Sequence, residues 1–252
     1  MSMNTQGIVI REQTLRENDR MISILTKDHG VVRAYVFGAK KLGGRLSSST
    51  QLFAFSDFSL NKKNDFYTVE HATAKDVFFE LRSDIEAISL AQYFAQLEEE
   101  FASSSESNSE FLRLMLNSLH IICKKARPLS QVKAVFEMRI MCLAGYMPDI
   151  LMCSGCGKYE DDTMFFDFSK TTLLCKNCSD GSGRRIDLAL LRALRHICYS
   201  EHEKIFNFSL SEESCKNLSS LTQDYLLSKA KRSFKTLDFY NALTRGDTAY
   251  DV

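Results

Sequence analysis

The sequence predicts an α+β protein in which a small β-barrel precedes a helical domain, and a four-cysteine module interrupts that domain. Three observations support this prediction. Short runs rich in Val, Ile, Tyr and Phe occupy residues 1–77, apolar residues at helical spacing dominate most of the rest, and two Cys-x-x-Cys pairs stand between helical segments. The chain has 252 residues, of which 44% are hydrophobic and 25% charged, as is typical of folded globular proteins.

Five segments near the N-terminus are expected to be strands, because β-branched and aromatic residues are concentrated in them and no helical pattern separates them. The expected strands are residues 7–11, 21–26, 31–37, 53–60 and 66–70. Gly30 can adopt the positive φ of a tight turn between the second and third strands. Five short strands of this kind favour a barrel of the OB type, a fold that often binds oligonucleotides.

The remaining segments are predicted to be mainly helical. Ser83 is expected to cap the first helix, Ser107 and Glu110 to form a capping box for the second, and Gly145 to end the third. The apolar residues of the expected helices span 85–101, 111–123, 130–144, 187–198 and 211–232. We therefore expect an OB-fold domain at residues 1–80 and a helical domain at residues 81–252, which the cysteine module interrupts at residues 150–183.

Two Cys-x-x-Cys pairs separated by 18 residues match the spacing of four-cysteine zinc sites. The predicted ligands are Cys153, Cys156, Cys175 and Cys178. Four thiolates saturate a tetrahedral Zn²⁺ and leave no position for water, so we expect a structural zinc ion. A hairpin across Ser169 and Lys170 would return the second pair to the first, as in a zinc ribbon. The alternative is a redox dithiol, for which one pair would be sufficient.

No motif in the sequence indicates catalysis. The phosphate-binding and dinucleotide-binding glycine motifs, the His-Glu-x-x-His motif and the Gly-x-Ser-x-Gly motif are absent, and the five histidines are dispersed. We therefore expect that the protein is not an enzyme. The first residues lack the pattern of a secretory signal, and no apolar run approaches the roughly 18 residues of a membrane-spanning helix. A cytoplasmic protein with no membrane partner is expected.

The 32 basic and 32 acidic residues cancel in total, but they are unevenly distributed. Residues 1–63 contain ten basic and five acidic side chains, which suggests an anionic partner. A glycine-rich loop after the third strand carries Lys40, Lys41 and Arg45, and a flexible basic loop beside a barrel suits phosphate contact. The alternative is a solvated loop without a ligand. Bases could stack on Tyr35, Phe37, Phe53 or Phe55, although the core is expected to hold most of these rings.

Four stretches of the chain carry a resemblance to a known family. They are Gly7–Arg11 followed by Glu17–Arg20, the loop Gly38–Lys41, the run from Phe136 through Leu143-Ala144-Gly145-Tyr146-Met147-Pro148 to Cys153, and the tail Ser233–Leu237. With these motifs the sequence resembles the bacterial RecO family of recombination mediators.

The resemblance implies an N-terminal OB barrel, a helical domain and an inserted zinc ribbon. It also implies a role in DNA repair through the RecF pathway, in the cytoplasm at the nucleoid. Members bind single- and double-stranded DNA, anneal complementary strands and work with RecR to load RecA onto single strands coated with single-strand-binding protein (SSB). An apolar pocket of the helical domain receives the acidic tail of SSB. The DNA contacts expected on this basis are Arg11, Arg33, Lys40, Lys41 and Arg45.

Two other functions remain as alternatives. One is a zinc-braced scaffold that binds proteins through its helices and does not contact DNA. The other is a zinc-dependent enzyme that acts on nucleic acid, which would need an open coordination position that four cysteines do not leave.

Overall fold

The structure is a computed structural model of the chain, and it describes residues 2–15, 19–39, 46–63, 66–102 and 108–246. Contacts divide the chain into two units. The first unit comprises residues 1–123 and 234–252, and the second comprises residues 124–233. The boundary predicted between residues 80 and 81 falls inside the first unit, and it remains a prediction about which segment folds on its own.

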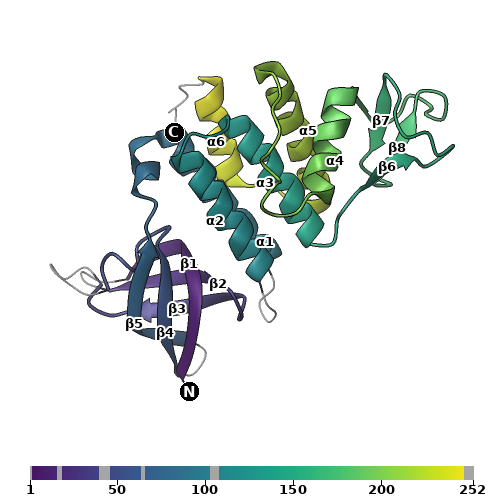
Figure 1. Cartoon of the computed structure of the whole chain (residues 1–252). Coiled ribbons are helices and arrows are strands. Elements are labelled where there is room, and N and C mark those ends of the chain that lie inside the picture. The colour runs from purple at the N-terminus through teal and green to yellow at the C-terminus, as the bar shows by residue number, and fades with distance from the viewer. Residues whose placement is uncertain (1, 16–18, 40–45, 64–65, 103–107, 247–252) are drawn as a thin grey trace. The chain divides into compact units, whose positions relative to one another are not determined.

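A closed barrel of five strands forms the N-terminal part of the first unit (Figure 1). Its strands are β1 (Ser2–Thr14), β2 (Arg20–Thr26), β3 (Val31–Val36), β4 (Phe55–Lys63) and β5 (Phe66–Asp76). The order around the barrel is β1-β2-β3-β5-β4, and all pairs are antiparallel except β3 with β5. The predicted OB-type barrel is confirmed, although β1 begins earlier and β5 ends later than the sequence pattern indicates.

Strand β1 closes the barrel because it pairs along both of its edges. Gly7 lies opposite Thr26 of β2 and also opposite Ser56 of β4. A Cβ atom at Gly7 would lie 2.6 Å from Cγ2 of Ile24 and 2.8 Å from the carbonyl oxygen of Leu25. Only glycine therefore fits where β1 passes between its two partners.

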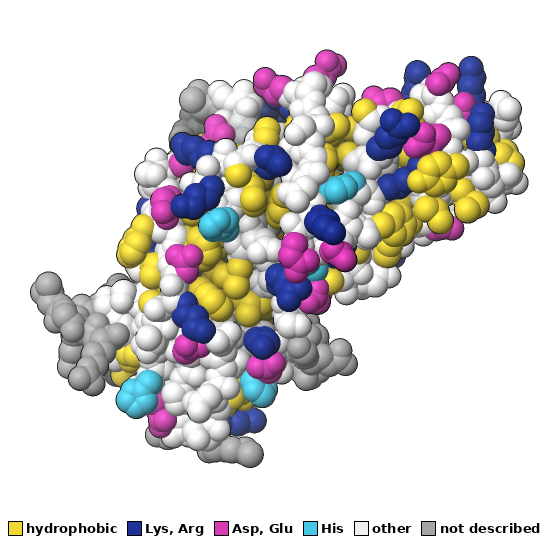
Figure 2. All heavy atoms as spheres, viewed as in Figure 1, with side chains coloured by type: hydrophobic (Ala, Val, Ile, Leu, Met, Phe, Trp, Pro, Cys, Tyr) yellow, Lys and Arg dark blue, Asp and Glu magenta, His cyan; other side chains and the backbone are white. Residues whose placement is uncertain are grey.

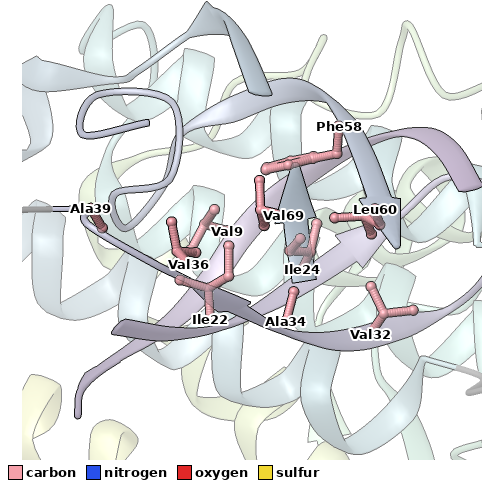
Figure 3. Close-up of a cluster of buried hydrophobic side chains, with 10 residues drawn as sticks. All are labelled: Val9, Ile22, Ile24, Val32, Ala34, Val36, Ala39, Phe58, Leu60 and Val69. Atoms are coloured by element: carbon pink, nitrogen blue, oxygen red, sulfur yellow. The ribbon is translucent and has the colours of Figure 1, made fainter. Parts of the chain in front are cut away.

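Alternate strand residues point into the barrel and form its core (Figure 3). The buried cluster contains ten side chains: Val9, Ile22, Ile24, Val32, Ala34, Val36, Ala39, Phe58, Leu60 and Val69. Because side chains alternate along a strand, Arg33 and Tyr35 of β3 point outward. Between Val9 and Arg11 the pairing of β1 with β2 shifts by one residue. This bulge turns Arg11 outward, although it lies two residues from a core position.

In its described residues, the helical part of the first unit begins with a short 3₁₀ helix and contains three α-helices. They are η1 (Phe79–Ser83), α1 (Ile85–Phe101), α2 (Ser109–Cys123) and α6 (Lys235–Arg245). The prediction that Ser83 caps α1 is wrong. The carboxylate of Asp84 accepts hydrogen bonds from the backbone N–H groups of Glu86 and Ala87, each at 3.1 Å. Ser83 lies in η1, where its hydroxyl donates to the carbonyl oxygen of Glu80 at 2.7 Å. Ser107 of the predicted capping box lies outside the described residues.

Helix α6 is not predicted by the sequence pattern, and it packs against α1. Only Leu237 and Tyr240 of this helix are buried, so its apolar stripe is too short to stand out in the sequence. The hydroxyl of Thr236 donates to the side-chain oxygen of Gln96 on α1. These contacts place a segment from the end of the chain in the unit that begins it.

The second unit combines three helices with a four-stranded sheet. The elements are α3 (Leu129–Leu143), β6 (Asp149–Cys153), β7 (Met164–Asp167), β8 (Thr172–Cys175), β9 (Arg184–Ile186), α4 (Leu188–Tyr199) and α5 (Glu212–Ala230). The sheet has the order β6-β8-β7-β9. Gly145 ends α3 as predicted: it has a φ of 86°, and the N–H of Tyr146 returns to the carbonyl of Met141 at 2.8 Å. In the described part of the chain, no helix combines the length and the apolar character that a membrane crossing requires.

A buried ion pair joins α3 to α5 in the core of the second unit. The ammonium of Lys133 lies 2.8 Å from a carboxylate oxygen of Glu137, and their side chains are 2% and 0% exposed. The hydroxyl of Thr222 on α5 donates to the other carboxylate oxygen of Glu137 at 2.7 Å. Lys133 also donates to the hydroxyl and carbonyl oxygens of Ser219, at 3.3 and 3.4 Å. Each charge is thus compensated inside the core, as a buried charge requires.

A second buried charge-bearing group, Glu98 of α1, has no such compensation. The side chain is fully buried, and neither carboxyl oxygen has a hydrogen-bond partner among the described residues. Burial raises the pKa of Glu98 well above its ordinary value. The folded chain therefore retains a proton that the unfolded chain releases above about pH 4.3, and this difference lowers the free energy of unfolding as the pH rises.

We expect Glu137→Leu to destabilise the second unit by about 3–5 kcal/mol, because it leaves Lys133 buried without a counter-charge. The double substitution Lys133→Met, Glu137→Leu should restore most of the lost stability. Urea denaturation of the wild type and these two variants measures both effects. The exposed pair Glu212–Lys216 on α5, which lies 2.7 Å apart, is the control, and Glu212→Leu should cost less than about 1 kcal/mol. A double variant no more stable than Glu137→Leu would contradict this account.

We expect Glu98→Gln to stabilise the protein by an amount that increases with pH, because glutamine has no proton to lose on unfolding. The gain should begin near pH 4.3, and it should grow by at most about 1.4 kcal/mol per pH unit until the folded-state pKa is reached. Denaturation between about pH 5 and pH 8 measures it, with the exposed Glu100→Gln on the same helix as control. A difference that does not change with pH would show that Glu98 is not held protonated.

Candidate metal centre and nucleic-acid interface

The sheet of the second unit brings four cysteines together. Cys153 ends β6 and Cys175 ends β8, and the two strands are neighbours in the sheet. Each strand runs into a turn that carries the second cysteine of its pair, Cys156 or Cys178. The four sulfur atoms all lie within 4.8 Å of one another, and Sγ of Cys156 is 3.7 Å from Sγ of Cys175. Four sulfurs bound to one Zn²⁺ are about 3.8 Å apart, so this donor set fits a tetrahedral ion.

Two turns of similar geometry shape the cysteine cluster. The N–H of Gly157 donates to the carbonyl of Cys153 at 2.8 Å, and the N–H of Ser179 donates to the carbonyl of Cys175 at 2.9 Å. Gly157 has a φ of 74°, which glycine adopts without strain. A Cβ atom at Gly155 would lie 3.0 Å from Sγ of Cys178, so a side chain there would crowd the cluster. The glycines thus let the backbone fold closely around the sulfurs.

The ionisation of the cluster is uneven. Burial raises the pKa of the Cys153 thiol, but hydrogen bonds from the backbone N–H groups of Cys175, Gly155 and Cys156 outweigh burial and lower this pKa to about 6. Hydrogen bonds with the other sulfurs, that of Cys156 first, raise the pKa of Cys178 to about 12. Once one sulfur is charged, the next resists ionisation. A divalent cation would stabilise the thiolates of all four cysteines, so the cluster could hold a metal ion.

Arg195 of α4 anchors the cysteine module, and its role is not predicted from the sequence. Its guanidinium donates to the carbonyl oxygens of Ile150, Leu151 and Tyr159, at 2.9, 2.6 and 2.5 Å. It also lies 4.0 Å from the centre of the Tyr159 ring. Arg195 is buried although it is charged. A sequence signal for this buried role is that Arg195 directly follows Leu194, which belongs to the apolar stripe of α4.

Two of the five predicted DNA contacts lie together on the barrel. Arg11 of β1 and Arg33 of β3 are both exposed, and each lies opposite Ser23 of β2 in the strand register. They line a shallow groove of about 130 Å³ together with Gln13, Met21, Ile22 and Ser23. Lys40, Lys41 and Arg45 lie outside the described residues. On the face shown in Figure 2, basic and acidic side chains are interspersed.

The start of the basic loop is fixed to the barrel. The N–H of Gly38 donates to the carboxylate of Asp19 at 2.9 Å, and Ala39 is buried in the barrel core. Of the aromatic residues considered for stacking, Phe53 is buried, whereas Phe37 is exposed and Tyr35 is half-buried. The ring of Phe55 is half-buried and has the ammonium of Lys75 at 5.9 Å from its centre.

Comparison with known proteins places both halves of the chain in one family. The family described as "Recombination protein O N terminal" matches residues 1–78, and the family described as "Recombination protein O C terminal" matches residues 82–238. "DNA repair protein RecO" of Acetivibrio thermocellus is 32% identical over 245 residues, covering 96% of this chain and 98% of the relative. The protein of the same name from Caldicellulosiruptor bescii is 26% identical over 238 residues, covering 94% of this chain and 97% of the relative. The chain therefore belongs to the RecO family of DNA repair proteins.

Proposed function

We propose that this chain is a recombination mediator that binds DNA and catalyses no reaction of its own. It binds single- and double-stranded DNA through the barrel and anneals complementary strands without ATP. With RecR it helps to load RecA onto single strands coated with SSB, in the cytoplasm at the nucleoid. The observation that carries this proposal is the outward face of β1, β2 and β3, where Arg11 and Arg33 flank one groove in a chain of the RecO family.

The two arginines are available to a phosphate backbone. Among the described residues no carboxylate pairs with Arg33. Arg11 lies 3.7 Å from Glu99; the arginine side chain is exposed and the glutamate is half-buried. An ion pair at the surface contributes little stability, and a phosphate can replace the carboxylate. We propose that Lys40, Lys41 and Arg45 extend this contact, since they follow β3 in the chain. Positive charge between two strands lowers the repulsion that slows their pairing, so annealing needs no nucleotide.

We propose that Cys153, Cys156, Cys175 and Cys178 hold a structural zinc ion. Such an ion binds four thiolates and contributes folding free energy, and it keeps no position open for water or substrate. Contacts within the protein also stabilise the cysteine module. Arg195 fixes the backbone around β6 to α4, and the sheet holds the ends of β6 and β8 together.

A second candidate function, a scaffold that binds proteins without contacting DNA, is favoured by a different observation. Leu151 and Met152 of β6 and the nearby Tyr159 are exposed apolar side chains in the second unit. Figure 2 shows hydrophobic side chains gathered in the region of this sheet. Such a patch suits a protein partner, and RecR or the acidic tail of SSB is the partner we propose. The mediator contacts DNA and the scaffold does not, so direct DNA binding decides between them.

Strand annealing tests the proposed function. Complementary oligonucleotides carrying a fluorescence donor and acceptor are mixed with the protein in the absence of nucleotide, first bare and then coated with SSB. Acceleration in both cases that disappears at high salt supports a mediator. A folded, zinc-loaded chain that neither binds nor anneals DNA would support the scaffold.

We expect Arg33→Ala to reduce the salt dependence of single-strand binding. Loss of one phosphate contact lowers the slope of log K against log salt by about 0.7. Fluorescence anisotropy with labelled oligonucleotides at several salt concentrations measures the slope. Arg113→Ala, which removes an exposed arginine of α2 that pairs with Glu110, is the matched control and should leave the slope unchanged. Equal slopes for wild type and Arg33→Ala would remove Arg33 from the interface.

We expect the purified chain to contain one zinc ion, and Cys153→Ser to lose that ion together with the fold of the cysteine module. Structural zinc in small zinc domains contributes about 10–16 kcal/mol of apparent binding free energy, so loss of the ion should strongly destabilise the module. Elemental analysis and limited proteolysis measure the two effects, with Cys123→Ser, outside the cluster, as control. A Cys153→Ser chain that stays fully folded but loses DNA binding would contradict a structural role.

A further inference from the structure

Three aromatic side chains gather beside the groove of Arg11 and Arg33. Tyr35 lies on β3, Phe37 directly follows that strand, and Phe66 begins β5. Phe37 is 62% exposed, more than any other large hydrophobic side chain in the described part of the chain, and Phe66 is 40% exposed. Leaving such rings in water costs free energy, so a group of exposed rings is suited to a ligand that covers it.

Two of the three rings are nearly parallel, and the third meets one of them edge to face. The rings of Tyr35 and Phe37 are inclined by only 13°, and their centres are 6.4 Å apart. This spacing follows from the strand, because residues two apart on one face are separated by about 6.6 Å. The rings of Phe66 and Tyr35 meet edge to face, with centres 5.3 Å apart and planes inclined by 66°. Neighbouring bases in a strand are about 3.4 Å apart. The 6.4 Å between the ring centres of Tyr35 and Phe37 is therefore close to two base steps.

Positive charge continues the same outward row. Arg33 lies two residues before Tyr35 on β3, so both side chains point to the same side of the barrel. Ser23 of β2 lies between Arg33 of β3 and Arg11 of β1 in the strand register. The residues that line the groove include no acid. Aromatic faces followed by cations are the combination that binds unpaired nucleic acid, in which rings stack on bases and cations contact phosphates.

We infer that Tyr35, Phe37 and Phe66 form a stacking surface for unpaired bases, and that this face of the barrel selects single strands whose phosphates lie on Arg33 and Arg11. The inference rests on the proposed DNA binding and adds base contact to phosphate contact. In a duplex the bases are stacked on one another and paired, so duplex DNA gains only the contribution of charge. Every base has a π face, so the surface tolerates any sequence.

A single tryptophan tests the contact directly. The chain contains no tryptophan, so Phe37→Trp introduces the only indole. We expect oligothymidylate to quench its fluorescence, and a duplex of equal length to quench it far less. Phe79→Trp is the matched control, because Phe79 is 58% exposed in the same unit but lies on η1. Equal quenching at both positions, or none at Phe37→Trp while the oligonucleotide is bound, overturns the inference.

Affinity measurements separate stacking from charge. Phe37→Ala should weaken single-strand binding by about 5- to 150-fold, the range expected for loss of one stacked base, and should leave duplex binding and the salt slope unchanged. Phe37→Leu, which keeps apolar area without a ring, should weaken it similarly. Full affinity in either variant overturns the stacking surface while DNA binding by the wild type stands. A wild-type chain that binds no DNA overturns both this inference and the proposed function.

Discussion

Strand β1 is held by two neighbours at once, and the missing side chain of Gly7 permits this arrangement. The outward face of the barrel depends on the resulting register. Because β1 pairs with β2 as it does, Arg11, Ser23 and Arg33 form one row across three strands. A slip of one residue would turn every side chain of a strand to the opposite face and bury the arginines. The strands pair around a closed barrel, so the groove lies on a continuous sheet.

The second unit is organised by charges that are satisfied inside it. Arg195 binds three backbone carbonyls around β6, and Lys133 and Glu137 join α3 to α5. A metal ion at the cysteines would therefore add to a module whose base is already attached to a helix. The two units also differ in the ligands that their surfaces suit. The barrel carries cations and rings suited to nucleic acid, whereas the cysteine module presents apolar side chains suited to a protein.

Sequence reasoning succeeded where a single local pattern decides the structure. Alternating apolar residues located the barrel strands, spacing located the four cysteines, and Gly145 marked the end of α3. It failed where the decision depends on distant residues. Phe53 fits the alternation of a strand, yet its φ is 63° and its N–H donates to the carbonyl of Val9. Neither the bulge that exposes Arg11 nor the carbonyls that hold Arg195 leave a periodic trace in the sequence.

The position of α6 has a consequence for how the chain is made. The first unit is interrupted after Cys123 and resumes at Phe234, so the whole second unit is an insertion within it. A ribosome must therefore synthesise the inserted unit before α6 can cover its face of α1. During this interval α1 remains partly uncovered, because Phe234 has not yet been synthesised. In the folded unit the ring centre of Phe234 lies 6.1 Å from that of Tyr93 on α1. Assembly of the first unit is thus timed by translation of the second, and a nascent chain that stops early exposes an apolar face to chaperones and proteases.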